Sequence, residues 1–212
     1  MVAEAWRLFI AIPVPDEVRS ALAAALDPVR ARFRDGRWQS ADTWHLTLRF
    51  VGDTPVGDLP AIEQAIRAVA ATGAPFRIEL GEAGSFERRR GGRVVWVGLA
   101  LGGPEVAALA GRLASALAPG EPADLPPQVH LTIARDAPDG LVAAVVAAME
   151  EFRAGTRGAE RAGRVGLGSR SVGPLVGEGS FAWMADRLVL YRSVLGRGGA
   201  THTALLEARL GS

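Results

Sequence analysis

Two closely matched tetrapeptides constrain this chain more than any other feature. They are His-Leu-Thr-Leu at 45–48 and His-Leu-Thr-Ile at 130–133, and they hold two of the three histidines. Each lies at the same place relative to an upstream apolar run, because Phe9 precedes the first histidine by 36 residues and Trp96 precedes the second by 34. This matched spacing predicts an internal repeat.

The repeat predicts the architecture. Short apolar runs alternate with stretches of helical periodicity in the order strand, helix, strand, helix, strand, once over about 7–86 and again over about 93–172. Further apolar runs at 188–195 and 204–210 predict strands that complete the sheets. We therefore expect an α+β fold in one domain, residues 1–212. Its two pseudo-symmetric lobes would each hold a mainly antiparallel sheet with helices on the outer face and a cleft between them.

Three local expectations accompany this architecture. A helix should open at Pro15, and Pro28 should kink or split it, because proline removes a backbone donor. Gly52 and Asp53 are typical of a turn after the first histidine strand. The Gly- and Arg-rich stretch 154–164 is typical of a loop, and a strand is expected over 165–172.

Composition excludes several kinds of chemistry. Cysteine is absent, which excludes disulfide frameworks, thiol catalysis and Cys-ligated metals, and fits a cytoplasmic location. All 24 basic residues are arginine, so a Walker-type phosphate loop, a Schiff base and a nucleotidyl-lysine are excluded as well. The formal net charge is +1, so any nucleic acid would have to be bound by a local patch.

The paired motifs point to acid–base chemistry at phosphorus. Alternate side chains of a strand share a face, so His45 and Thr47 should point one way, as should His130 and Thr132. Two imidazoles can serve as acid and base near neutral pH, and two hydroxyls can hydrogen-bond one phosphate. A metal site is the main rival, but no carboxylate is paired with either histidine and no His-x-x-x-His is present. We therefore expect no metal and no cofactor.

The residues around these motifs resemble a known family. The stretches are His-Leu-Thr-Leu-Arg-Phe-Val-Gly-Asp at 45–53, His-Leu-Thr-Ile-Ala-Arg at 130–135 and Arg-Leu-Phe-Ile-Ala-Ile-Pro at 7–13. Supporting matches are Trp44, 85–86, 94–99 and 190–193. Together they resemble the two-histidine phosphoesterases, and among these the RNA 2′,3′-cyclic phosphodiesterases, long called the 2′-5′ RNA ligase family.

The resemblance implies roles for five residues. It makes His45 the proton donor to the leaving ribose oxygen and His130 the proton acceptor from water. It assigns phosphate binding to Thr47, Thr132 and Arg135. Strict alternation would turn Arg135 toward the core, so we expect the strand to end or bulge near Ala134.

Four other places are candidates for substrate contact. Phe9 is a candidate to stack a base, and Arg49 should line the cleft because it shares the face of His45. The basic turn at 87–93, with Arg88, Arg89 and Arg90, is either a solvated loop or an RNA contact. His202 stands where the resembled family often has tyrosine, and we interpret it as a packing or rim residue, with base contact as the alternative.

The expected function is hydrolysis of RNA or nucleotide 2′,3′-cyclic phosphate ends to 2′-phosphates, catalysed without metal by a monomer with no obligate protein partner and no membrane contact. Two alternatives keep the fold. The substrate could be a 2′-5′-linked oligonucleotide, hydrolysed or ligated in reverse, or an ADP-ribose cyclic phosphate. The chain could also be a module that binds RNA ends without turnover.

Overall fold

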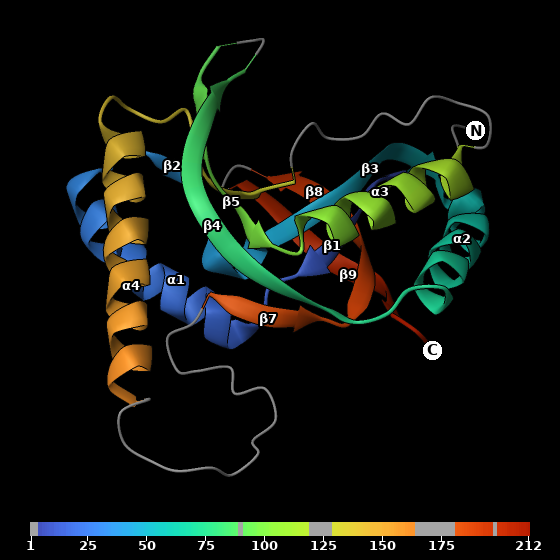
Figure 1. Ribbon diagram of the computed structural model, residues 1–212. Coiled ribbons are helices and arrows are strands. Elements are labelled where there is room, and N and C mark those ends of the chain that lie inside the picture. Colours follow the sequence, from blue (N-terminus) through green and yellow to red (C-terminus); the bar gives the residue numbers. More distant parts are fainter. Residues whose placement is uncertain (1–3, 89–90, 119–128, 164–180, 197–198) are drawn as a thin grey trace.

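Two antiparallel sheets form the frame of the molecule (Figure 1). The computed structural model describes residues 4–88, 91–118, 129–163, 181–196 and 199–212. The first sheet has the strand order β3 (His45–Pro55), β1 (Ala5–Pro13), β8 (Arg187–Gly196), β9 (Gly199–Arg209). The second has the order β2 (Arg37–Trp38), β6 (Leu131–Arg135), β5 (Arg93–Leu101), β4 (Phe76–Glu87), β7 (Ala182–Ala185). The expected α+β fold with two lobes is confirmed.

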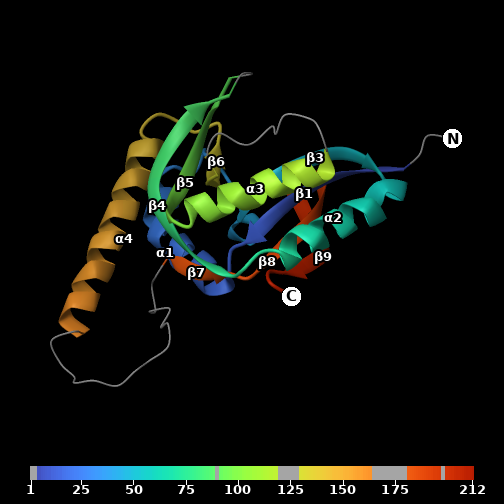
Figure 2. The ribbon, with the colours of Figure 1, turned by 45° about the vertical axis from the view of Figure 1, so that its right-hand side comes forward.

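Four α-helices cover these sheets in pairs. Helices α2 (Leu59–Ala71) and α3 (Gly103–Leu117) pack together against the first sheet, on β9 and β3 respectively. Helices α1 (Asp16–Arg32) and α4 (Leu141–Gly163) pack together on the other side of the molecule, where α4 contacts β4. Figure 2 shows the same pairing from a second direction. Two 3-10 turns, Ala41–Thr43 and Val56–Asp58, flank β3.

The two repeat units are interleaved between the lobes. Strand β1 lies in the first sheet, but the helix that follows it, α1, packs with α4 beside the second. In the second unit β5 lies in the second sheet, and its following helix, α3, packs on the first. The crossed helices mean that neither lobe consists of one repeat. The strand predicted over 165–172 lies outside the described residues.

The core lies between each sheet and its helices. On β3, Leu46 and Leu48 are fully buried, whereas Thr47 between them is only half-buried. On β6, Leu131 and Ile133 are likewise fully buried, and Thr132 between them is half-buried. This alternation leaves the opposite face of both strands available for polar residues. Among the described residues, no helix is both long and apolar enough to cross a membrane.

Three local predictions need correction. Pro28 does not split α1, which continues to Arg32, because Pro28 faces solvent while its neighbours Leu26 and Val29 are buried in the core. Gly52 and Asp53 lie within β3, where Gly52 has a φ of 88° and the pairing with β1 continues to Pro55. The predicted loop at 154–164 is helical as far as Gly163. Its Ala, Glu and Arg residues favour helix strongly enough to outweigh the glycines.

Replacing Pro28 by Ala should raise the free energy of unfolding by about 1–2 kcal/mol. Alanine restores the N–H bond to the Ala24 carbonyl, a gain of about 3 kcal/mol that the more flexible unfolded chain offsets by about 1 kcal/mol. Urea unfolding followed by circular dichroism measures the difference. The neighbouring exposed substitution Asp27→Ala should stay within about 0.5 kcal/mol. A Pro28→Ala variant no more stable than the parent would contradict this account of α1.

Candidate active site

One cleft of about 710 Å³ brings the two motifs together. Its lining includes His45, Thr47, His130 and Thr132, so the first lobe and the second lobe each contribute one motif. Strands β3 and β6, the second of which begins directly after His130, also contact each other. The convergence predicted from strand alternation is therefore present.

His45 is fixed by a backbone contact and an aromatic floor. Its Nδ1 lies 2.7 Å from the Thr43 carbonyl oxygen. A carbonyl can only accept, so Nδ1 carries a proton and Nε2 is the atom left for exchange. The Phe9 ring lies 4.6 Å from the imidazole, centre to centre. Burial lowers the pKa of His45 to about 4, an effect that the Thr43 hydrogen bond opposes and the nearby His202 and Arg135 reinforce.

His130 has a corresponding aromatic setting in the other lobe. The Phe86 ring lies 5.4 Å away, edge to face, and the Trp96 ring lies 6.2 Å away. Trp96 belongs to β5 as Phe9 belongs to β1, so each histidine is packed by an aromatic residue from the inner strand that neighbours its motif strand. The two histidines, which occupy equivalent places in the sequence repeat, therefore also have equivalent aromatic neighbours in the structure.

Strands β3 and β6 each contain a bulge within the motif, and the bulge changes which of the following residues face the cleft. On β6, Thr132 pairs with Trp96 and Ala134 with Val95, so Ile133 is the additional residue. Consequently Ile133 and Ala134 are both buried, and Arg135 lines the cleft together with Thr132. The bulge required for Arg135 is confirmed. On β3 the same irregularity falls at Leu48, the equivalent motif position.

The charges of the cleft all have one sign. Its charged lining residues are Arg7, Arg37, Arg49, Arg88 and Arg135, and no aspartate or glutamate is among the described lining residues. Burial lowers the pKa of Arg135, and the neighbouring Arg88 and Arg37 lower it further, yet an arginine remains protonated at neutral pH. The described part of the chain also contains no cluster of three histidines or acids that could hold a metal. The cleft therefore suits an anion.

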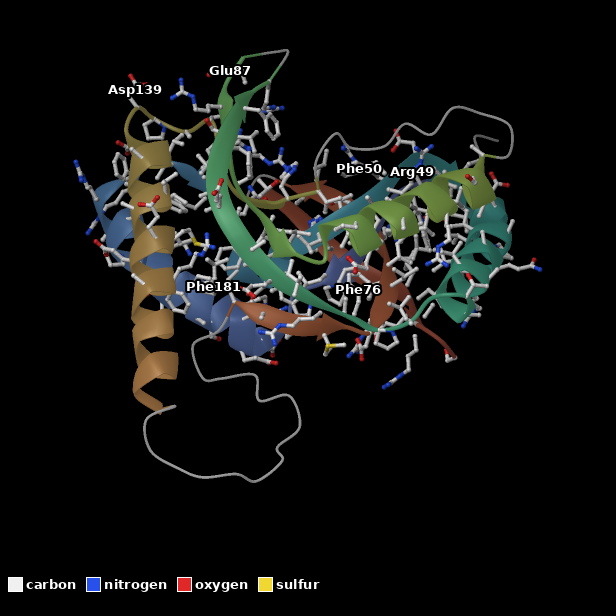
Figure 3. All side chains as sticks on the ribbon, viewed as in Figure 1. Arg49, Phe50, Phe76, Glu87, Asp139 and Phe181 are labelled. Carbon is white, nitrogen blue, oxygen red and sulfur yellow. The ribbon has the colours of Figure 1, made fainter. Side chains whose placement is uncertain are left out.

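The two predicted substrate contacts, Phe9 and Arg49, differ in how accessible they are to a ligand. Arg49 and Phe9 both line the cleft. Phe9 lies beneath His45, stacked 5.1 Å from Tyr191, and only 3% of it is exposed, so a base could reach little of its ring. The neighbouring Phe50 also lines the cleft and is 66% exposed. Figure 3 shows it beside Arg49, away from the end of the β4–β5 hairpin that carries Glu87.

His202 belongs to the site. It lies on β9, 4.9 Å from Phe9 and 5.3 Å from His45, both edge to face, and burial lowers its pKa. It thus packs against His45, as the packing interpretation predicts, while also lining the cleft.

Several lining residues were not predicted from the sequence, among them Arg7, Arg37, Phe50 and Phe86. Arg7 lies two residues before Phe9 on one strand, and that spacing could have revealed it. Arg37 comes from a two-residue strand and Phe86 from the end of β4, and neither has a local sequence signal. Phe50 reaches the cleft beside Arg49 because β3 has bulges at Leu48 and Val51, and no sequence pattern predicts these bulges. Of the basic turn, Arg88 lines the cleft, whereas Arg89 and Arg90 lie outside the described residues.

Sequence comparison relates part of the chain to known phosphoesterases. Residues 12–96 match the family model of LigT-like phosphoesterases. An RNA 2′,3′-cyclic phosphodiesterase of Geobacillus stearothermophilus is 33% identical over 91 residues, 43% of this chain and 29% of that protein. A protein of the same name from Thermus thermophilus is 40% identical over 80 residues, 38% of this chain and 40% of that protein. The matches thus span less than half of these relatives.

Structural comparison extends the similarity to nearly the whole chain. A protein of Thermus thermophilus with a solved crystal structure has a TM-score of 0.68 at 28% identity, covering 97% of this chain and 98% of that one. Escherichia coli LigT has a TM-score of 0.66 at 24% identity, covering 99% and 100%, and shows the shared fold. Together, the family match over residues 12–96 and the fold match over nearly the full length show that this chain is similar to the LigT-like phosphoesterases.

Proposed function

We propose that this protein hydrolyses RNA or nucleotide 2′,3′-cyclic phosphate ends to 2′-phosphates. The observation that carries the proposal is the convergence of two imidazoles and two threonine hydroxyls in one cleft whose charged residues are all arginine. The relatives named RNA 2′,3′-cyclic phosphodiesterase support the substrate class. A cyclic phosphodiester carries one negative charge, which this cleft would attract.

In the proposed reaction, His130 accepts a proton from water as the water oxygen bonds to phosphorus. The bond from phosphorus to the 3′ oxygen breaks, and that oxygen takes a proton from His45. The 2′ bond remains, so the product is a 2′-phosphate. Each proton transfer should contribute roughly 10²- to 10⁴-fold in rate.

The remaining proposed roles concern the phosphate. Thr47 and Thr132 would donate hydrogen bonds to its non-bridging oxygens, and Arg135 would bind it with a charge-assisted bond. Phe9 would hold the His45 ring at its working angle, which replaces the base-stacking role first considered for it. No metal is required, because the two histidines supply the acid and the base.

The assignment of His45 as acid makes a demand on its protonation state. With a pKa of about 4 in the free protein, His45 is neutral at pH 7 and has no proton to give from Nε2. An anion beside Nε2 favours the imidazolium form and raises its pKa. Under this proposal, the substrate's own charge prepares the acid.

The pKa of His45 should therefore change on ligand binding. In the free protein, NMR titration of the ring protons should place it well below 6.5, and saturation with adenosine 2′-monophosphate should raise it. The same shift predicts that stability decreases as the pH drops from 6.5 to 4, because in that range the unfolded chain binds a proton that folded His45 does not. A His45→Gln variant should show a shallower decrease. A His45 pKa that stays below 5 with ligand bound would contradict its role as acid.

The leaving group separates the roles of the two histidines. His45→Ala and His130→Ala should each lower kcat on a cyclic nucleotide by about 10²-fold or more. A nucleoside 2′-(p-nitrophenyl phosphate) has a leaving group that needs little protonation. On it His45→Ala should regain most of its activity, and His130→Ala should not. Kinetics on both substrates, in excess EDTA, measure this.

His202→Gln is the matched control for the leaving-group experiment. His202 contacts His45 but takes no proton in the proposal, so its substitution should affect both substrates by the same factor. Recovery by His130→Ala in place of His45→Ala would reverse the roles. Near-normal cyclic-nucleotide turnover by both alanine variants would refute the catalytic proposal, and binding without turnover by the parent would favour an RNA-end-binding module. A divalent requirement would refute metal independence.

A further inference from the structure

An ion-pair cluster beside Arg135 unites three elements at the rim of the cleft. Arg37 from β2 and Arg88 from the β4–β5 hairpin both approach Asp136, at 2.9 Å and 3.5 Å from its two carboxylate oxygens. Asp136 directly follows Arg135. Both arginines line the cleft, whereas Asp136 is not among its lining residues.

The backbone around this cluster is shaped for the contact. Asp136 has a φ of 48°, the left-handed region that aspartate and asparagine tolerate better than most residues. Gly92, in the turn of the β4–β5 hairpin, lies against Asp136 and has a φ of 84°. A Cβ at residue 92 would overlap the Asp136 carboxylate. The hairpin is also joined to this loop by the bond from the Ala137 N–H to the Arg93 carbonyl.

The ion pairs of the cluster should contribute little to the stability of the fold, because they are exposed to solvent. The three side chains are 70%, 40% and 36% exposed for Arg37, Arg88 and Asp136, and exposed ion pairs stabilise proteins only weakly. What the carboxylate does is hold two guanidinium groups side by side. Each uses its Nη1 for Asp136, so other N–H donors of each remain for a ligand.

We infer that Arg37 and Arg88, aligned by Asp136, form a second phosphate subsite next to the catalytic phosphate position. This inference rests on the proposed function. A nucleotide ending in a 2′,3′-cyclic phosphate continues only on its 5′ side, so a second phosphate near Arg135 is the one attached to the 5′ oxygen of the same nucleoside. The substrate class is then an oligonucleotide, or a nucleotide with a 5′-phosphate, in preference to a simple cyclic nucleoside phosphate.

Two ligands that differ by this one phosphate test the subsite without relying on turnover. They are adenosine 2′,5′-bisphosphate and adenosine 2′-monophosphate, with Kd measured by isothermal titration calorimetry. The parent protein should bind the bisphosphate at least about tenfold more tightly. The double variant R37Q/R88Q should lose most of that preference, because each charge-assisted hydrogen bond to a phosphate strengthens binding by about 10- to 100-fold. It should also make bisphosphate binding less sensitive to salt, because two positive charges are removed from the subsite.

Arg93→Gln is the matched control. Arg93 lies next to the turn of the same hairpin, where it pairs with Glu87 and with Asp139, which precedes α4 (Figure 3). It does not line the cleft. Its substitution should leave the preference within about twofold of the parent. An equal loss in Arg93→Gln and in the double variant would assign the effect to general surface charge and overturn the inference.

Asp136→Asn distinguishes alignment from charge. Asparagine tolerates the same left-handed backbone. Removing the carboxylate adds net positive charge, which alone would tighten bisphosphate binding. If Asp136 aligns the arginines, the preference should instead fall at least about threefold. A preference that rises in Asp136→Asn, or that survives in R37Q/R88Q, refutes the subsite. If the preference behaves as expected but no cyclic phosphate is hydrolysed, the subsite stands and the proposed function fails.

Discussion

The contact between β3 and β6 is the constraint on which the rest of the site depends. These strands carry the two motifs, belong to different sheets, and meet where the lobes join. Because each repeat sends its first helix to the opposite lobe, the lobes are joined through covalent connections as well as packing. The relative position of His45 and His130 is therefore set by the interleaved frame and not by a flexible loop.

The charges around the cleft favour an anionic ligand. Arginines from both lobes line it without a described acidic residue, while Asp136 stands just outside and pairs with two of them. Burial among aromatic rings keeps His45 neutral in the free protein, because the charged form loses hydration there. Under the proposed function, such a site would gain its protonated acid when an anion binds.

The sequence was informative where a pattern has one physical meaning. The repeated His-x-Thr motif predicted which residues converge. The misfit of Arg135 with strict alternation predicted that the strand would end or bulge near Ala134, and the bulge lies at Ile133. Single residues with two competing effects were less predictable. Pro28 opposes helix but lies on the solvent face, and Phe9 is aromatic near the cleft but lies under His45. Arg37 could not be predicted, because its place depends on a two-residue strand pairing with β6.

A crystal structure with bound adenosine 2′-monophosphate tests the central claim most directly, namely that one phosphate is held between the two motifs. The account predicts the phosphorus between the two imidazoles, with His45 Nε2 and a ring nitrogen of His130 facing opposite sides of it and both threonine hydroxyls bonded to its oxygens. A phosphate bound by the arginines of the rim, out of reach of either histidine, would contradict it.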